Sequence, residues 1–272
     1  MLAGLILSSW LATSAAPARW MDLAISDRDQ TLHAISQDPF DRRLLKVSER
    51  FLDTPYQPSP LGEGGGRDAD PRLRFDAVDC LTFVEETIAL SYVLESAQVE
   101  PVLTRLRYAS EPTYEDRNHL MEAQWLPQNI GKGFVRDVTR TYGGRSTRTF
   151  RKTLTRETWA SKFSRGLGLP QNRQPLGTFE WEMIPLPSVL ALVDRIPSGT
   201  LLAVVREDRA FKPTRISHVG FVFHHGKQTY LRHATRRFAK VLDEDFRSFL
   251  SRNAKYEKWK VVGVSLFEVV AP

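Results

Sequence analysis

The chain has one residue able to act as a strong nucleophile. Cys80 is the only cysteine among 272 residues, so it cannot form a disulfide within the chain. A lone cysteine is either a small buried hydrophobic residue or a reactive thiol. A thiol becomes an effective nucleophile when a nearby imidazole takes its proton and later returns it to the leaving group.

His218 and His233 are the strongest candidates among six histidines for that imidazole chemistry. His218 begins an apolar run at 218–223, and His233 ends a predicted strand at 229–233. The end of a strand fixes an imidazole while leaving it accessible, so His218 could be the base and His233 could set its tautomer. A chance pairing is the alternative. Because no His-Glu-x-x-His or Cys-x-x-Cys pattern occurs, we expect neither a metal nor another cofactor.

The two predicted strands, one beginning at His218 and the other ending at His233, predict a β-hairpin. His225-Gly226 is the natural centre of its turn, because glycine accepts positive φ freely, and His224 would lie in the turn too. This register places His218 directly opposite His233, on one face of the sheet, with Cβ atoms roughly 4.5–5.5 Å apart. A loop one residue longer or shorter would turn His233 to the other face.

The cysteine begins a segment with helical periodicity. Residues 80–97 lack Gly and Pro, and their apolar residues recur at helical spacing, which predicts a largely buried helix. Asp79 is a suitable N-cap, so Cys80 would lie in the first turn. There the backbone N–H groups and the helix dipole favour a thiolate, so we expect a lowered pKa for the Cys80 thiol.

The other elements separate into a helical half and a strand-rich half. Segment 27–51 predicts a helix broken at Asp38-Pro39, and the Pro- and Gly-rich 54–66 predicts a loop. Region 101–197 alternates short helical stretches with loops. Strands are predicted where β-branched and aromatic residues gather, at 201–206, 219–223, 229–233 and 261–269. We therefore expect one α+β domain at 19–272, with helices that carry the nucleophile packed on a C-terminal antiparallel sheet.

Composition and charge restrict the possible partners. The chain is 42% hydrophobic and 26% charged, which is typical of a soluble globular protein, and its formal charge is +6. The Arg-rich span 145–156 could approach an anionic polymer, although we prefer a solvated loop. Since no nucleic-acid-binding motif accompanies it, no nucleic-acid partner is expected.

The first residues predict export. Residues 2–16 are apolar, and Ala16-Pro17-Ala18 supplies small residues for a signal peptidase, although no Lys or Arg precedes the run. We predict a signal peptide at 1–18 and a mature protein in the periplasm or cell envelope, without stable membrane insertion. A buried helix and an uncleaved anchor are the alternatives.

Segment 75–85, Phe-Asp-Ala-Val-Asp-Cys-Leu-Thr-Phe-Val-Glu, resembles the Asp-Cys-x-Thr-Phe-Val-Glu signature of the N-acetylmuramoyl-L-alanine amidase-like family, a former domain of unknown function. That family belongs to the NlpC/P60 group of papain-like cysteine hydrolases. The resemblance extends from about Phe51 to Val270. Further matches occur at 54–56, 61–64, 107–108, 117–119, Trp125, Asn129, 217–220 and 233–234. One departure is Leu81, where the family usually has Val or Thr.

The resemblance implies an NlpC/P60-type papain-like fold and a role for each matched residue. Cys80 matches the nucleophile, His218 the general base, and His233 the residue that orients the base. Tyr56 matches a tyrosine that reaches the active-site cleft.

Other matched residues have two possible roles. Asp79, beside the nucleophile, could bind substrate or cap the helix, and we favour the cap. Arg117, Asn118 and His119 match a family motif that could bind substrate or form a structural corner with buried hydrogen bonds. Trp125 is expected in the core or the cleft wall.

The implied activity is hydrolysis of an amide bond in peptidoglycan or muropeptides through a thioester, as an N-acetylmuramoyl-L-alanine amidase. A peptidoglycan D,L-endopeptidase cuts between D-Glu and the next residue and is an alternative. A papain-like acyltransferase would need an acyl tunnel beside Cys80. A non-catalytic wall-binding module would not need Cys80, His218 and His233 together.

Overall fold

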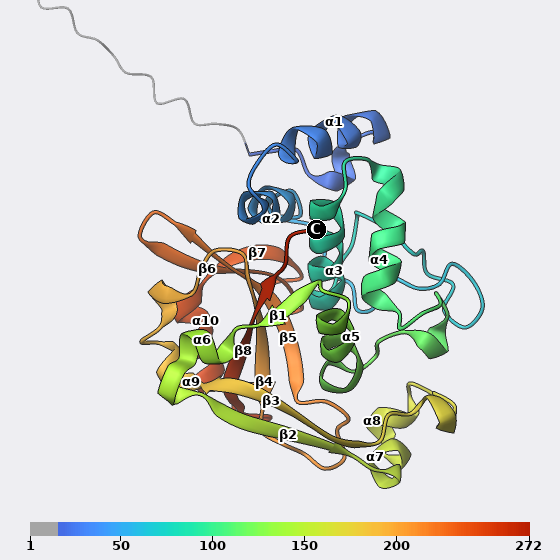
Figure 1. Cartoon of the computed structure of the whole chain (residues 1–272), viewed down its shortest axis with the longest axis vertical. Helices are drawn as coiled ribbons and strands as arrows, with labels where there is room; N and C mark the ends of the chain where they lie inside the picture. The colour runs from blue at the N-terminus through green and yellow to red at the C-terminus, as the bar shows by residue number, and fades with distance from the viewer. Residues whose placement is uncertain (1–15) are drawn as a thin grey trace, which may run out of the picture.

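The computed structural model describes residues 16–272, in which helices cover both faces of an antiparallel sheet (Figure 1). The predicted signal peptide at 1–18 therefore lies outside the described residues, apart from its last three. No helix within 16–272 is long and apolar enough to cross a membrane. The α+β class predicted from the sequence is confirmed.

The N-terminal part is helical, largely as predicted. The broken helix forms α1 (Ile25–Ile35) and α2 (Phe40–Glu49). Helix α3 (Cys80–Tyr92) begins at the predicted residue but ends before the predicted position near 97. The helix ends there because the backbone of Val93 takes a β conformation, with φ −117° and ψ 162°. A 3₁₀ turn, η2 (Ser96–Gln98), then leads into α4 (Val99–Arg107).

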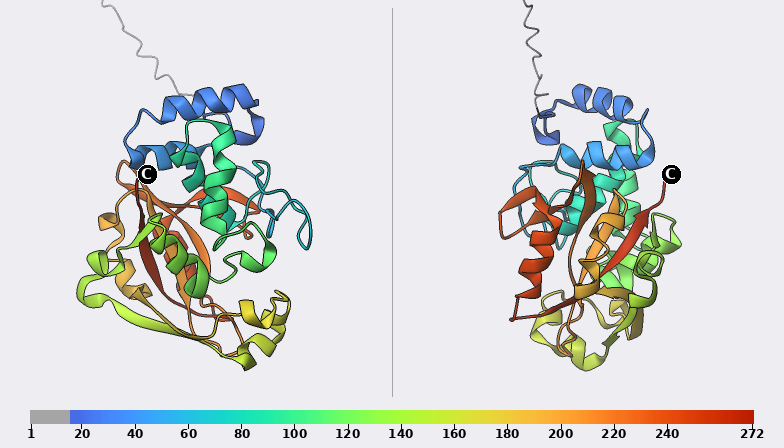
Figure 2. Two further views of the ribbon diagram at one scale, coloured as in Figure 1. Left: turned by 45° about the vertical axis from the view of Figure 1, so that its right-hand side comes forward. Right: turned by 90° about the vertical axis from the view of Figure 1, so that its left-hand side faces the viewer.

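The remaining helical segments are short. They are η1 (Trp20–Asp22), η3 (Tyr114–Asp116), the π-helical turn η4 (Met121–Trp125), α5 (Leu126–Gly131), α6 (Thr139–Gly143), η5 (Gly144–Ser146), α7 (Arg156–Ala160), α8 (Lys162–Arg165), η6 (Gln171–Arg173), α9 (Leu186–Val189), η7 (Val193–Arg195) and α10 (Phe246–Ala254). Of these, α9 and α10 pack on the face of the sheet opposite α3. Both views in Figure 2 show α1 and α2 at one end of the molecule and α7 and α8 at the opposite end.

The sheet has the order β2-β3-β8-β4-β5-β6-β7, and β1 also pairs with β8. Every strand pair is antiparallel. The strands are β1 (Val135–Asp137), β2 (Arg148–Leu154), β3 (Gly177–Pro185), β4 (Thr200–Arg206), β5 (Ile216–His225), β6 (Gln228–Thr235), β7 (Lys240–Asp245) and β8 (Val261–Val269).

The four predicted strands correspond to β4, β5, β6 and β8, but β1, β7 and the β2–β3 pair were missed. Most of the Arg-rich span 145–156, which was expected to be a loop, lies in β2. The sequence of β2 lacks a clear apolar alternation, because Lys152 occupies a buried position in it. The Lys152 ammonium is only 1% exposed and pairs with Asp208 at 2.9 Å. A buried inward-facing position in a strand is usually hydrophobic, but here a long-range ion pair allows a lysine to occupy it.

The β5–β6 hairpin turns one residue later than predicted. His225 pairs with Gln228, so the turn is Gly226-Lys227, with φ 58° at Gly226, and His224 lies in β5. His218 and His233 are therefore diagonal neighbours and not direct partners. They nevertheless share a face, because moving the turn by one residue while keeping its length preserves the alternation.

The central strands divide the core between two faces. In β4, Leu201 and Ala203 belong to the cluster that includes α3, whereas Leu202 and Val204 belong to the cluster that includes α9 and α10. In Figure 1, α3 and α10 accordingly lie on opposite sides of β4 and β5. This arrangement holds the first turn of α3 beside the start of β5.

Candidate active site

Four of the predicted site residues line one cavity of about 280 Å³. They are Tyr56, Cys80, His218 and His233, and they come from the loop before α3, the first turn of α3, β5 and β6. The cavity also reaches Phe249 of α10, against which both imidazoles pack, with ring centroids 6.2 Å and 5.5 Å away. The fold thus brings together segments separated by more than a hundred residues.

Local hydrogen bonds fix Cys80 as the first residue of α3. The Asp79 carboxylate accepts N–H bonds from Leu81 at 3.0 Å and Thr82 at 2.8 Å, and the Thr82 hydroxyl accepts the N–H of Asp79 at 2.8 Å. This reciprocal cap satisfies helix N–H groups that otherwise lack partners. The capping role favoured for Asp79 is therefore present.

The expected lowering of the Cys80 pKa is wrong for this structure. Burial of the thiol and the charge of the adjacent Asp79 raise its pKa to about 12, against opposing N–H groups of Val219, Cys80 and Leu81. The capping carboxylate that positions the cysteine also disfavours its thiolate, because the two negative charges repel.

The two histidines form a direct hydrogen bond. Nε2 of His218 lies 2.6 Å from Nδ1 of His233, and the rings are nearly perpendicular at 78°. Gly220 makes this contact possible, since a Cβ there would lie 2.8 Å from the Cβ of His233. Burial and the neighbouring His233 lower the pKa of His218 well below its ordinary value, so its resting imidazole is neutral.

A carboxylate continues the chain beyond His233. Oε2 of Glu244 lies 3.2 Å from Nε2 of His233, as a close electrostatic contact without the alignment of a full hydrogen bond. Glu244 also accepts N–H bonds from Arg252 at 2.7–3.1 Å. Burial raises the pKa of Glu244, but the His233 and Arg252 side chains outweigh it, and its pKa is lowered. The carboxylate is therefore ionised at neutral pH.

Tyr56 reaches the same cavity from a segment that lies between the residues preceding α3 and those preceding β7. Its backbone N–H donates to Ala239 at 2.9 Å, and it forms a bridge with Val78. Burial and the nearby Cys80 raise the pKa of Tyr56 to about 12. The phenol therefore stays protonated at neutral pH and can donate a hydrogen bond.

Arg117, Asn118 and His119 lie elsewhere, around a cavity of about 180 Å³ that Asp79 also borders. The Arg117 guanidinium binds Glu63 and Asp68, and Nε2 of His119 lies 2.7 Å from the carbonyl of Tyr114.

Asn118 donates to the carbonyl of Leu106 at 3.3 Å, and burial lowers the pKa of His119 to about 4. These engaged groups favour the structural-corner alternative. Trp125 is fully buried and donates to Glu85 at 2.8 Å, as expected of a core residue.

Several residues of the cavity that holds Cys80 and the two histidines were missed by sequence reasoning. Arg206, Arg236 and Arg252 line it, and Arg206 donates to the Ser217 hydroxyl at 2.7 Å. Arg206 and Arg236 had a local signal, because Arg206 ends the strand predicted at 201–206 and Arg236 follows the strand that contains His233, whereas Arg252 had none.

Another missed residue, Glu122, anchors the start of β5. Its buried carboxylate accepts the backbone N–H of Ile216 at 2.8 Å and also binds Thr214 and Arg215. Among residues 16–272, no group of three or more His, Cys, Asp or Glu side chains could hold a metal ion.

The fold and cavity define an α+β protein with a thiol and a bonded imidazole pair at one site. A family model described as AmiA-like, N-acetylmuramoyl-L-alanine amidase-like, matches residues 46–256, and the chain belongs to this family. The family predicted from the sequence is confirmed.

Solved structures share the fold. A Legionella pneumophila protein matches with a TM-score of 0.79 and 20% identity, over 92% of this chain and 95% of that one. An N-acetylmuramoyl-L-alanine amidase from Bacteroides uniformis matches with a TM-score of 0.65 and 20% identity, over 85% and 99%. A putative xylanase from Bacteroides fragilis also has a TM-score of 0.65, at 20% identity over 82% and 99%. Among curated proteins, no match to the chain was found.

Proposed function

We propose that this chain is a papain-like, NlpC/P60-type cysteine hydrolase, a single domain at 19–272, that cleaves the amide bond between N-acetylmuramic acid and L-Ala in peptidoglycan or muropeptides. The observation that carries the proposal is the shared cavity of Cys80 and the His218–His233 pair. Family membership supports the amide bond and the peptidoglycan substrate.

The carboxylate at the end of the chain sets the tautomers of both imidazoles. An ionised Glu244 favours a proton on Nε2 of His233, which leaves Nδ1 of His233 as an acceptor. His218 then donates its own Nε2–H to that Nδ1 at 2.6 Å. The remaining Nδ1 of His218 carries a lone pair and is the base.

Catalysis starts from a neutral pair. Sγ of Cys80 attacks the carbonyl carbon while its proton moves to Nδ1 of His218, because the raised thiol pKa and lowered imidazole pKa disfavour a resting ion pair. His218 then protonates the departing amine and the thioester forms. Water attacks the thioester, His218 takes the water proton and returns it to sulfur, and the carboxylate product leaves.

Two donors can stabilise the tetrahedral oxyanion. The N–H of Cys80, at the first helical position, has no intrahelical partner. The protonated hydroxyl of Tyr56 is the second donor, since its raised pKa keeps the proton in place. The N–H of Leu81 is less suited, because Asp79 already accepts it.

The surrounding charge suits a muropeptide. Arg206, Arg236 and Arg252 border the cavity, and muropeptides carry several carboxylates. For Asp79, Arg117, Asn118 and His119 we propose an indirect role, as residues that fix the first turn of α3 and its surroundings.

The test is mass analysis of purified muropeptides incubated with wild type, Cys80→Ala and His225→Ala. His225 is an exposed histidine on the same strand as His218, so it is a matched control. We expect a sugar with a free lactyl carboxylate and a peptide beginning with L-Ala from wild type and His225→Ala only. Cleavage after D-Glu would instead identify the endopeptidase, and undiminished cleavage by Cys80→Ala would reject thiol catalysis.

Export is a separate part of the proposal, based on the apolar run and on Ala16-Pro17-Ala18. Mass spectrometry of the mature protein from its host should find an N-terminus near Arg19. An intact Met1 in the cytosolic fraction would reject it.

A further inference from the structure

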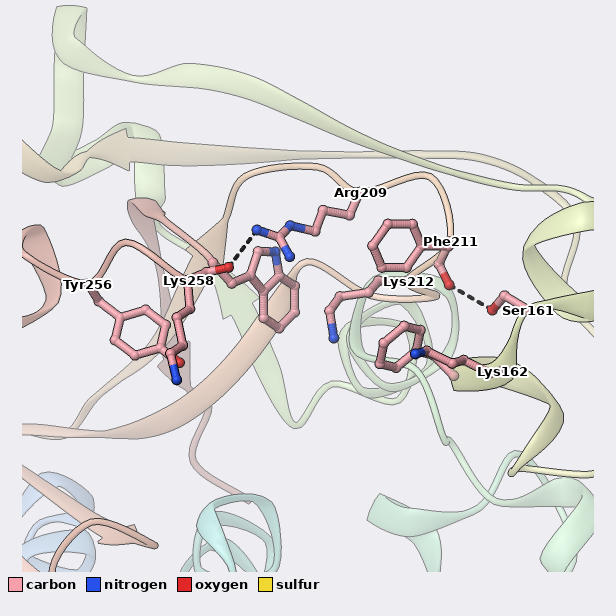
Figure 3. Close-up of a pocket in the computed structure, with 9 residues that line it drawn as sticks. Ser161, Lys162, Arg209, Phe211, Lys212, Tyr256 and Lys258 are labelled. Atoms are coloured by element: carbon pink, nitrogen blue, oxygen red, sulfur yellow. Dashed lines mark hydrogen bonds between the residues drawn. The ribbon is translucent and has the colours of Figure 1, made fainter.

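A third cavity, of about 570 Å³, is shown in Figure 3. Three segments form it: the start of α8, the β4–β5 loop and the α10–β8 loop. Its walls combine aromatic rings with basic side chains, namely Phe163, Phe211, Tyr256 and Trp259 with Lys162, Arg209, Lys212 and Lys258. Phe163, Phe211 and Tyr256 are each between 41% and 46% exposed. Such exposure is unusual for large aromatic rings, which are mostly buried in folded proteins.

Three of the four basic groups in this aromatic–basic pocket lack acidic partners within residues 16–272, whereas Arg209 pairs with Glu207 at 2.9 Å. Lys162, Lys212 and Lys258 form no ion pair with any carboxylate in the part of the chain that the structure describes. The Lys212 ammonium lies 4.1 Å from the Phe163 ring centroid and 4.4 Å from that of Trp259. Burial and the neighbouring cations lower the pKa of Lys212, so an anion there would relieve mutual repulsion.

The pocket is held in shape by contacts between its segments. The Ser161 hydroxyl donates to the carbonyl of Phe211 at 2.7 Å, and Arg209 donates to the carbonyl of Lys258 (Figure 3). The buried Lys152 donates to the carbonyl of Arg209 at 3.0 Å from below the loop. A preformed pocket binds with little loss of side-chain entropy.

Arg206 connects the pocket with the catalytic cavity. It lines the catalytic cavity, and its guanidinium lies 4.9 Å from the Tyr256 ring and 5.2 Å from the Trp259 ring. One extended ligand could therefore contact both places at once.

We propose that the aromatic–basic pocket is a subsite for a muramic acid residue that has lost its peptide, and so has a free lactyl carboxylate, in the same glycan chain as the residue whose amide bond is cut in the catalytic cavity. The exposed rings suit the apolar C–H face of a pyranose, and Lys212 with its neighbours suits the carboxylate. A peptide of acidic residues would use the cations but not the rings. This assignment rests on the proposed function for its choice of glycan, but its test does not require turnover.

Binding should be measured by calorimetry with Cys80→Ala protein, so that no substrate is consumed. The probes are peptide-free peptidoglycan glycan chains, the same chains with amidated carboxylates, neutral chitotetraose, and a tetraglutamate peptide. We expect the glycan chains to bind, and the amidated chains and chitotetraose to bind at least about tenfold more weakly, as for loss of a charge-assisted hydrogen bond.

Substitutions should then locate the site. Lys212→Met and Phe163→Ala, each in the Cys80→Ala background, should weaken glycan binding at least about tenfold. Lys227→Met, at an exposed lysine in the β5–β6 turn, should leave it unchanged. Circular dichroism of each variant checks that it is folded.

Three results would overturn the assignment: glycan binding unaffected by Lys212→Met and Phe163→Ala, equal binding of chitotetraose, or tighter binding of tetraglutamate than of glycan. Glycan binding by a protein that hydrolyses no muropeptide would reject the proposed function alone.

Discussion

Two cavities meet at the first turn of α3, and both are bordered by residues of the family motifs. In the proposed catalytic cavity, the His218–His233–Glu244 chain leaves Nδ1 of His218 available. In the other cavity, Arg117 and His119 are engaged with carboxylates and a backbone carbonyl. A polar group with unused bonding capacity beside open space can do chemistry, whereas a fully engaged one holds the fold. Side-chain type alone does not distinguish the two.

We expect the strongest loss of activity on substitution of the proposed base, His218. His218→Ala should lower kcat by at least about a thousandfold, because it removes both proton transfers, while stability changes little. Muropeptide turnover and urea denaturation of His218→Ala and His225→Ala measure the two quantities. A loss of activity shared by His225→Ala would mean that the assay reports folding instead of catalysis.

The opposite pattern is expected for Arg117→Ala. It leaves Glu63 and Asp68 without their cation, so the free energy of unfolding should fall by about 3 kcal/mol, as when one partner of a buried ion pair is removed. Turnover per folded molecule should change less than about threefold. Arg42→Ala, at an exposed arginine on α2, is the control. Unchanged stability with a raised KM would return Arg117 to substrate binding.

A smaller effect separates the base from the residue that orients it. His233→Ala should lower kcat by about a hundredfold, less than His218→Ala, because the base remains but loses its fixed tautomer. His233→Gln keeps an acceptor for Nε2–H of His218 and should recover part of the loss. If glutamine and alanine were equally impaired, the hydrogen bond at 2.6 Å would not be what orients His218.

The pH dependence of thiol alkylation reports the protonation state of Cys80 in the free enzyme. A pKa raised to about 12 means that the free enzyme holds less thiolate than an ordinary cysteine at every pH below that value. Labelling of Cys80 by iodoacetamide should therefore be slower than that of glutathione at pH 7 and still be rising at pH 9 to 10. A plateau below pH 7 would indicate a resting thiolate–imidazolium pair and contradict the neutral starting state.

Burial of His119 should make the free energy of unfolding depend on pH in acid. Because the pKa of His119 is lowered to about 4, its contribution is present above the unfolded value near 6.5 and is lost as the pH falls from there towards 4. Urea denaturation at pH 7.5 and 4.5 should show a smaller loss for His119→Gln than for wild type. An equal loss in both would assign the acid sensitivity to other groups.

Local features, such as the start of a helix or the face of a strand on which a side chain lies, could be predicted from residues a few positions apart in the sequence. Asp79 and Thr82 are three positions apart, which is enough to start α3 at Cys80. The alternation in β5 and β6, together with a two-residue turn, was likewise enough to put His218 and His233 on one face. The family signature around Cys80 identified the family.

Features that depend on contacts between distant segments could be read only from the folded structure. The turn at Gly226-Lys227, the β2–β3 hairpin with its buried Lys152, and the pairing of His233 with Glu244 follow from long-range contacts. The sign of the Cys80 pKa shift was also decided there. A helix start favours the thiolate, but desolvation and the capping carboxylate oppose it more strongly, and burial is not a property that local spacing encodes.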